Sequence, residues 1–182
     1  MTLTEFQKRK LEIAFESYDF DGDGSLSKQD LERVASQASK IQDLRAGSSG
    51  KKKVESVITI GWDDLQGIAD SNSDGEVTLD EWYIFFDELV NNQSKFDQYL
   101  QASANRLIPY LDSDADGQIT LEDYKDFILS FNLGKSEAET AFKKLDTNND
   151  GFITREELKK IIEEFYLSND EKATGNWFLG RI

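Results

Sequence analysis

Apolar residues recur along most of this chain at intervals of three and four positions, the spacing that gathers them on one face of a helix. Four short segments interrupt the pattern, and each is polar and rich in acids. Helices are therefore predicted on both sides of every polar segment. Their apolar faces are Phe6, Leu11, Phe15 and Tyr18, then Leu31, Val34, Ala38 and Ile41, around the first segment; Val54, Val57, Ile58, Trp62, Leu65 and Ile68, then Trp82, Phe85, Phe86 and Leu89, around the second; Phe96, Tyr99, Leu100, Leu107 and Leu111, then Tyr124, Phe127, Ile128 and Phe131, around the third; and Phe142 and Leu145, then Leu158, Ile161, Ile162 and Phe165, around the fourth. We interpret these stripes as helix faces buried in a core rather than as a ligand-binding box.

Local signals mark some of the helix ends. Thr4 can cap the first helix, and Pro109, the single proline, is expected to end or kink the helix before the third polar segment. The stretch 46–53, AGSSGKKK, is predicted to be a flexible surface linker. Its three lysines could also dock an acidic partner or an anionic lipid head group, but a solvated linker is the better interpretation.

The four polar segments share one arrangement of oxygen-bearing side chains. They read DFDGDGSLSKQD from Asp19, DSNSDGEVTLDE from Asp70, DSDADGQITLED from Asp112 and DTNNDGFITREE from Asp146. Each has an acid at its first position, Asp or Asn at the third, Asp at the fifth, Gly at the sixth, an aliphatic residue at the eighth and an acid at the twelfth. This is the pattern of the EF-hand loop, which winds around a calcium ion and supplies oxygen ligands from alternate positions.

Metal ligands are therefore expected at positions 1, 3, 5, 7, 9 and 12 of each loop, with the backbone carbonyl serving at the seventh and a direct or water-mediated contact at the ninth. The candidate ligands are Asp19, Asp21, Asp23, Ser25, Ser27 and Asp30; Asp70, Asn72, Asp74, Glu76, Thr78 and Glu81; Asp112, Asp114, Asp116, Gln118, Thr120 and Asp123; and Asp146, Asn148, Asp150, Phe152, Thr154 and Glu157. The sixth-position glycines are Gly24, Gly75, Gly117 and Gly151, where a positive φ is expected. One such match would also fit an acidic turn without an ion. Four matches between helices favour metal sites, although any single loop could be too weak to fill.

The aliphatic residue at the eighth position of each loop predicts how the loops pair. Leu26 should face Val77 in one short β-bridge, and Ile119 should face Ile153 in another. The predicted fold is all-α, with four EF-hands in two pairs. We expect an N-terminal pair at 1–92, a C-terminal pair at 93–167 and a tail at 168–182 that packs on the body.

Composition and charge narrow the function. The 36 acids against 21 bases give a net charge of −15, which suits calcium sites and argues against nucleic acid as a partner. The absence of Cys excludes disulfides and thiol catalysis, and the absence of His removes the commonest general base, so no enzyme activity is expected. The first ten residues do not resemble a signal peptide, and no stretch is long enough for a membrane span. A cytoplasmic, monomeric protein without a stable membrane anchor is the expectation.

The chain also resembles the invertebrate sarcoplasmic calcium-binding proteins, and within them calexcitin, a neuronal calcium-signalling relative. The resemblance lies in the uneven spacing of the loops, in Asp30 at the end of the first loop, and in the segments 62–65, 80–82, 165–170 and 175–180. It implies that the four EF-hands pack into one compact globule and that no enzyme chemistry is involved. It also implies that the apolar tail is buried against the helices of the N-terminal pair. In that family at least one loop has usually lost its ligands, whereas all four loops keep them here.

Three functions follow as expectations. The first is a cytosolic calcium buffer or signal modulator that changes conformation on binding Ca²⁺, with Mg²⁺ also accepted at the first and third loops because their closing residue is the shorter Asp. The second is a calexcitin-like sensor acting on a protein target. The third is a coelenterazine- or luciferin-binding protein. The single Met argues against a Met-rich target groove, and the absence of His argues against photoprotein chemistry.

Overall fold

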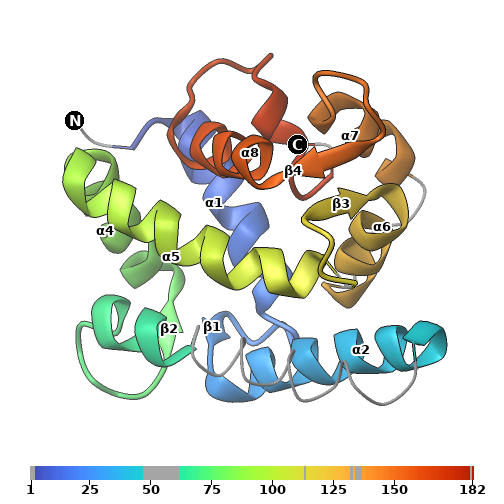
Figure 1. The fold of residues 1–182 in the computed structure, drawn as a ribbon. Coiled ribbons are helices and arrows are strands. Elements are labelled where there is room, and N and C mark those ends of the chain that lie inside the picture. The colour runs from blue at the N-terminus through green and yellow to red at the C-terminus, as the bar shows by residue number, and fades with distance from the viewer. Residues whose placement is uncertain (1–2, 47–61, 113, 132, 134–136, 181) are drawn as a thin grey trace.

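Helices and acid-rich loops alternate along the chain in the computed structural model, which describes residues 3–46, 62–112, 114–131, 133, 137–180 and 182 (Figure 1). The elements are α1 (Glu5–Tyr18), β1 (Ser25–Leu26), α2 (Lys28–Ala46), β2 (Val77–Thr78), α4 (Leu79–Val90), α5 (Gln93–Leu111), β3 (Gln118–Thr120), α6 (Leu121–Ser130), α7 (Ala138–Leu145), β4 (Phe152–Thr154), α8 (Arg155–Leu167) and the 3₁₀ turn η2 (Thr174–Trp177). A further helix at 62–69 enters the second loop. The prediction of an all-α fold with very short strands is confirmed.

Capping boxes start helices α1, α4, α6 and α8. Thr4 caps α1 as predicted: its hydroxyl accepts a hydrogen bond from the Gln7 amide, and the Gln7 side chain accepts one from the Thr4 amide at 3.0 Å. The helices α4, α6 and α8, which leave the second, third and fourth loops, begin the same way. Each is capped by the threonine at the ninth loop position, and its partner at the third helical position is the acid that closes the loop. The closing acids therefore have a structural role in addition to their candidate role as ligands.

Two antiparallel bridges pair the loops as the eighth positions predict. Leu26 lies opposite Val77 in β1 and β2, and Ile119 lies opposite Ile153 in β3 and β4. All four side chains are buried, with at most 3% of their surface exposed. The apolar residue at the eighth position thus ties each loop both to its partner and to the core.

The two pairs of EF-hands pack into one body. In Figure 1, α5 crosses the middle of the view, with α8 above it and α2 below it. The Gln37 side chain of α2 donates a 2.7 Å hydrogen bond to the Leu129 carbonyl of α6, and Phe86 of α4 stacks on Tyr166 of α8 with 4.7 Å between ring centroids. Aromatic rings from both pairs thus share one interior.

Two expectations need correction. Of the two outcomes expected at Pro109, the helix end does not occur and the kink stays a prediction. Helix α5 continues to Leu111, where Tyr110 and Leu111 are buried and the Asp112 amide donates to the Ile108 carbonyl at 2.8 Å. The tail was expected to lie against the helices of the N-terminal pair. The ring of Phe178 contacts Phe127 of α6 and Phe165 of α8 instead, at 5.5 and 5.8 Å between centroids. Polar tail groups such as Asn176, which accepts a hydrogen bond from Lys10, reach α1.

Two predictions from the sequence fall partly outside the described residues. The proposed linker at 46–53 falls there from residue 47 onward, as do Val54, Val57 and Ile58 of the predicted helix before the second loop.

Candidate metal sites and an interior cavity

All four loops share one backbone frame, built around the first-position aspartate. Its carboxylate accepts the amide of the sixth-position glycine, at 2.9 Å between Asp19 Oδ2 and Gly24 N and 3.0 Å between Asp146 Oδ2 and Gly151 N. The other oxygen accepts the amide of the fifth residue at 3.1–3.2 Å in every loop. These bonds fix the first carboxylate at the centre of the turn, where alternate side chains can converge.

Each loop has two left-handed residues, at its fourth and sixth positions. The sequence pattern predicted only the glycines at the sixth. The fourth-position residues are Gly22, Ser73, Ala115 and Asn149, with φ between 59° and 71°. Glycine and asparagine, which adopt this conformation readily, were the only hint of it in the sequence.

Three side-chain carboxylates come together in the first loop and three in the third. The ligand oxygens of Asp19, Asp21 and Asp23 lie within 4.8 Å of one another, and those of Asp112, Asp114 and Asp116 do the same. The second and fourth loops carry Asn72 and Asn148 at the third position, so each offers one carboxylate fewer. The seventh-position residues Ser25, Gln118 and Phe152 lie in strands β1, β3 and β4, and Glu76 directly precedes β2.

The closing residue of the first loop fits a cation. Asp30 is 1% exposed, and its Oδ2 atom accepts bonds from the Ser27 amide and hydroxyl at 2.9 and 2.5 Å. Its Oδ1 atom is buried without a hydrogen-bond donor. A buried carboxylate oxygen without a donor is costly unless a cation binds it, and an all-oxygen ligand set suits Ca²⁺.

The closing glutamates differ from each other. Glu157 has one oxygen bonded, by the Thr154 amide and hydroxyl at 3.0 and 2.9 Å. Glu81 has both bonded, because Ser71 donates to the second oxygen from its amide at 3.1 Å and its hydroxyl at 2.8 Å, in addition to the bonds from Thr78. Hydrogen bonds from Thr78 and Ser71 lower the pKa of Glu81 to about 2, so it stays ionised.

The ninth-position hydroxyls donate to the closing acids. Their donor–acceptor distances are 2.5–2.9 Å, and the residues are Ser27, Thr78, Thr120 and Thr154. Because each hydroxyl proton is already donated to the closing acid, the hydroxyl oxygen can still accept a hydrogen bond from a water bound to the ion. A water-mediated contact therefore fits these positions well.

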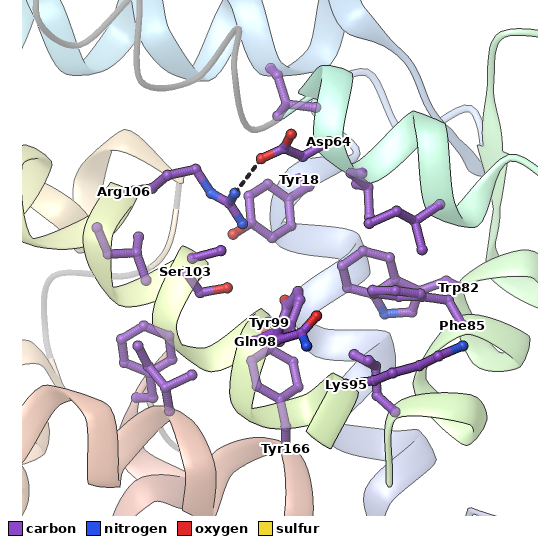
Figure 2. A pocket seen from close by; sticks show the side chains of 18 of the residues that line it. Tyr18, Asp64, Trp82, Phe85, Lys95, Gln98, Tyr99, Ser103, Arg106 and Tyr166 are labelled. Atoms are coloured by element: carbon purple, nitrogen blue, oxygen red, sulfur yellow. Dashed lines mark hydrogen bonds and ion pairs between the residues drawn. The ribbon is translucent and has the colours of Figure 1, made fainter. Parts of the chain in front are cut away.

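A cavity of about 540 Å³ lies between the two EF-hand pairs and opens to the surface at exposed residues such as Ile68 (Figure 2). Aromatic side chains from α1, α4, α5 and α8 line it, among them Tyr18, Trp82, Tyr99 and Tyr166. Burial raises the pKa values of the three tyrosines, so their phenols are neutral. Sequence reasoning assigned Tyr18, Trp82 and Tyr99 to a buried core and did not single out Tyr166. A cavity depends on how side chains from several elements meet, and periodicity contains no signal for it.

An ion pair lies at the edge of this cavity. Arg106 of α5 contacts Asp64 of the helix at 62–69, with 2.7 Å between Nη1 and Oδ2. Figure 2 shows this pair on one side of the tyrosine rings. It links the entering helices of the second and third loops across the cavity.

Two EF-hand families match the sequence. An EF-hand domain pair covers residues 8–86, and a single EF hand covers residues 138–162. These ranges include the first, second and fourth loops. Separately, no helix in the described part of the chain has the length and apolar content needed to cross a membrane.

Proteins similar in sequence include sarcoplasmic calcium-binding proteins. Sarcoplasmic calcium-binding proteins I, III and IV of Branchiostoma lanceolatum are 24% identical over 136 residues, which is 72% of this chain and 73% of theirs. The beta chain of the Penaeus sp. sarcoplasmic calcium-binding protein is 38% identical over 66 residues, 36% of this chain and 34% of that one. Calerythrin of Saccharopolyspora erythraea is 26% identical over 143 residues, 78% of this chain and 81% of that protein.

Solved structures agree with this fold over nearly the whole chain. The sarcoplasmic calcium-binding protein from amphioxus has a TM-score of 0.76 at 20% identity, covering 99% of both chains. The calcium-loaded apo form of the coelenterazine-binding protein from Renilla muelleri has a TM-score of 0.77 at 25% identity, covering 99% of this chain and 100% of that one.

Proposed function

Because this chain is an EF-hand calcium-binding protein related to the sarcoplasmic calcium-binding proteins, we propose that it is a cytosolic calcium buffer and signal modulator that changes conformation as Ca²⁺ fills its loops. The observation that carries this proposal is that one loop frame occurs four times. In each loop the first aspartate accepts a hydrogen bond from the amide of the sixth-position glycine, and the closing acid accepts one from the amide of the ninth residue. Calcium is its cofactor. We further propose that each loop holds one ion through the six positions described above.

A buffer is favoured over a target-binding sensor because the apolar surface is largely covered. The only large apolar side chains exposed in the described residues are Phe20, Ile68 and Ile84, which lie in the first loop, the helix at 62–69 and α4. Phe178 of the tail is 5% exposed. A groove for a target helix would need a continuous apolar surface.

Calorimetric titration with Ca²⁺, with and without millimolar Mg²⁺, tests this function. We expect several sites to bind, with little added fluorescence from the apolar dye ANS. A strong calcium-dependent rise in ANS fluorescence would instead favour the calexcitin-like sensor.

A second candidate function rests on the cavity. Its volume falls within the range of about 300–1,000 Å³ that is usual for small-molecule sites, and neutral phenols can donate hydrogen bonds to an uncharged ligand. The similarity to a coelenterazine-binding protein makes coelenterazine the first ligand to test. We propose this binding as an additional activity that is compatible with calcium buffering.

The test is a fluorescence titration of the protein with coelenterazine. Ala102 lines the cavity, so Ala102→Trp should fill part of it and abolish binding. Ile84→Trp, at a position that is 65% exposed, serves as the control and should bind normally. Absence of saturable binding to the unmodified protein would remove this candidate.

A further inference from the structure

Arg33 of α2 lies against the first loop, three residues after its closing acid. Its Nη1 atom forms an ion pair with Asp21 Oδ2 and lies 3.7 Å from Asp30 Oδ1. Asp21 and Asp30 occupy the third and twelfth positions, two of the candidate ligands. A single guanidinium group therefore bridges two carboxylates that we assign to calcium.

The first loop alone has an arginine at this position, the fifteenth counted from its first aspartate. The corresponding residues after the other loops are Ile84, Asp126 and Lys160. Lys160 is the other cation in this set, and its Nζ atom lies 3.9 Å from Glu164, which belongs to α8 and not to the loop. The bridge from Arg33 is therefore a feature of the first loop and not of EF-hands in this chain generally.

The contact is electrostatic and reversible. Arg33 and Asp21 are 42% and 40% exposed, so solvent and salt weaken their attraction. Asp30 Oδ1 has no hydrogen-bond donor even with Arg33 beside it. The guanidinium thus offsets part of the negative charge of the loop without supplying the contacts of a bound ion, and it competes with Ca²⁺ for the charge of the Asp21 carboxylate.

We propose that Arg33 is a built-in counter-ion of the first loop, which holds the ligand carboxylates together without calcium and weakens calcium binding at that loop. This inference rests on the proposed ligand set of the loop. It makes the first loop fill at higher calcium than its carboxylate content alone would give. It also reserves this site for calcium peaks, while the other loops act at lower concentration.

The test compares Arg33→Gln with Lys160→Gln in the full chain. Both changes remove one positive charge from the same position after a loop, but only Arg33 touches loop ligands. Calcium is titrated while the amide signals of Gly24, Gly75 and Gly117 are followed by NMR, together with that of Gly151. Each glycine amide donates to the first aspartate of its own loop, so it reports the filling of that loop.

In Arg33→Gln, the calcium concentration that half-converts the Gly24 signal should fall roughly three- to tenfold. The ion then no longer competes with an exposed ion pair and is no longer repelled by the guanidinium charge. The other three signals should shift by less than about twofold, and Lys160→Gln should leave Gly24 within the same limit. Arg33→Lys should give an intermediate value, because lysine keeps the charge without the planar fork. Adding salt should reduce the difference between the unmodified chain and Arg33→Gln.

Stability without calcium provides a second measurement. Removing the counter-ion should lower the melting temperature of Arg33→Gln in chelator but leave it unchanged at saturating calcium. An unchanged Gly24 titration, or an equal shift of all four glycines, overturns the proposal while leaving the calcium sites in place. If Gly24 responds to calcium in neither protein, the ligand assignment of the first loop is wrong, and this inference fails with it.

Discussion

At the scale of single residues, the four loops differ in the side chain that closes them. The closing residue is Glu in the second and fourth loops, as Glu81 and Glu157, and Asp in the first and third, as Asp30 and Asp123. In every loop the carboxylate of this residue accepts a hydrogen bond from the backbone amide of the ninth-position residue. Its backbone position is therefore similar in all four loops, and side-chain length is the main difference.

We predict that the second and fourth loops prefer Ca²⁺ over Mg²⁺ more strongly than the first and third. Glu reaches far enough to bind with both oxygens and complete a sevenfold shell, whereas one Asp oxygen suits the octahedral shell of Mg²⁺. NMR titration with each ion, read at the four loop glycines, measures the preference loop by loop. Equal competition by Mg²⁺ at all four loops would show that side-chain length does not set selectivity here.

A buried cation joins α1 to the end of α8. Lys10 is fully buried, and its Nζ atom donates to the carbonyls of Ser168 at 2.7 Å and Glu164 at 3.1 Å, and to Asn176 of the tail at 3.4 Å. Burial lowers the pKa of Lys10 from 10.5 to about 8, against an opposing effect of Glu164. Below pH 8 the folded and unfolded chains both hold this proton. Between pH 8 and 10.5 the unfolded chain holds a proton that the folded chain has released, so Lys10 makes stability rise with pH there.

Lys10→Met should lower the free energy of unfolding by about 1–3 kcal/mol at pH 7, because two carbonyls at the end of α8 lose a buried donor. It should also remove the part of the rise in stability between pH 8 and 9.5 that comes from Lys10. Denaturant unfolding in saturating calcium measures both effects. Lys8→Met is the control: Lys8 pairs with Glu5 at the surface, so its loss should cost less than about 1 kcal/mol. A pH profile identical in Lys10→Met and the unmodified protein would contradict this role.

At the scale of elements, the tail is seated on α8 through its backbone. The Gly175 amide donates to Glu164 Oε2 at 2.8 Å, and the Tyr124 hydroxyl of α6 donates to the carbonyls of Trp177 and Phe178 at 3.0 and 3.1 Å. A Cβ atom at Gly175 would lie 2.5 Å from the Ile161 carbonyl oxygen. The tail can therefore approach α8 this closely only with glycine at position 175.

Gly175→Ala should destabilise the calcium-bound protein by about 1–3 kcal/mol, because the backbone of the tail must move away from α8. It should also raise ANS fluorescence as Phe178 loses its contacts. Gly67→Ala is a matched control: Gly67 lies in the helix at 62–69, and a Cβ there meets nothing within 4 Å, so alanine should be neutral or stabilise by up to about 1 kcal/mol. If Gly175→Ala behaves like this control, the tail is not held by close packing at position 175.

At the scale of the whole molecule, calcium and folding are linked. The crowded carboxylates of the first and third loops repel one another without a cation, and the loops connect helices that share one core. An ion that binds only the folded chain adds RT ln(1 + [Ca²⁺]/Kd) of stability per site.

We therefore expect a large gap between the melting temperatures measured in calcium and in chelator. At a calcium concentration about 100 times Kd, each filled site adds about 2.7 kcal/mol. Magnesium should give a smaller increase, contributed mainly by the first and third loops. Melting curves that coincide with and without calcium would refute this linkage.

The sequence by itself determined the features that depend on residues close together in the chain. The spacing of acids from Asp19 to Asp30 and its three repeats, and the cap at Thr4, follow from local geometry. The pairing of Leu26 with Val77 joins two distant loops, and it was predictable because the loop pattern repeats an aliphatic residue at the eighth position. The ligand assignment itself stays a prediction until ions are bound. Only the tertiary structure decided the course of α5 beyond Pro109, the seat of the tail, the environment of Lys10, the contact from Arg33 and the cavity among the tyrosines. The contact from Arg33 to the first loop depends on the direction in which α2 leaves that loop. The other features depend on side chains that are distant in sequence and must fit together in one core. Periodicity shows which face of a helix is buried but not what that face meets.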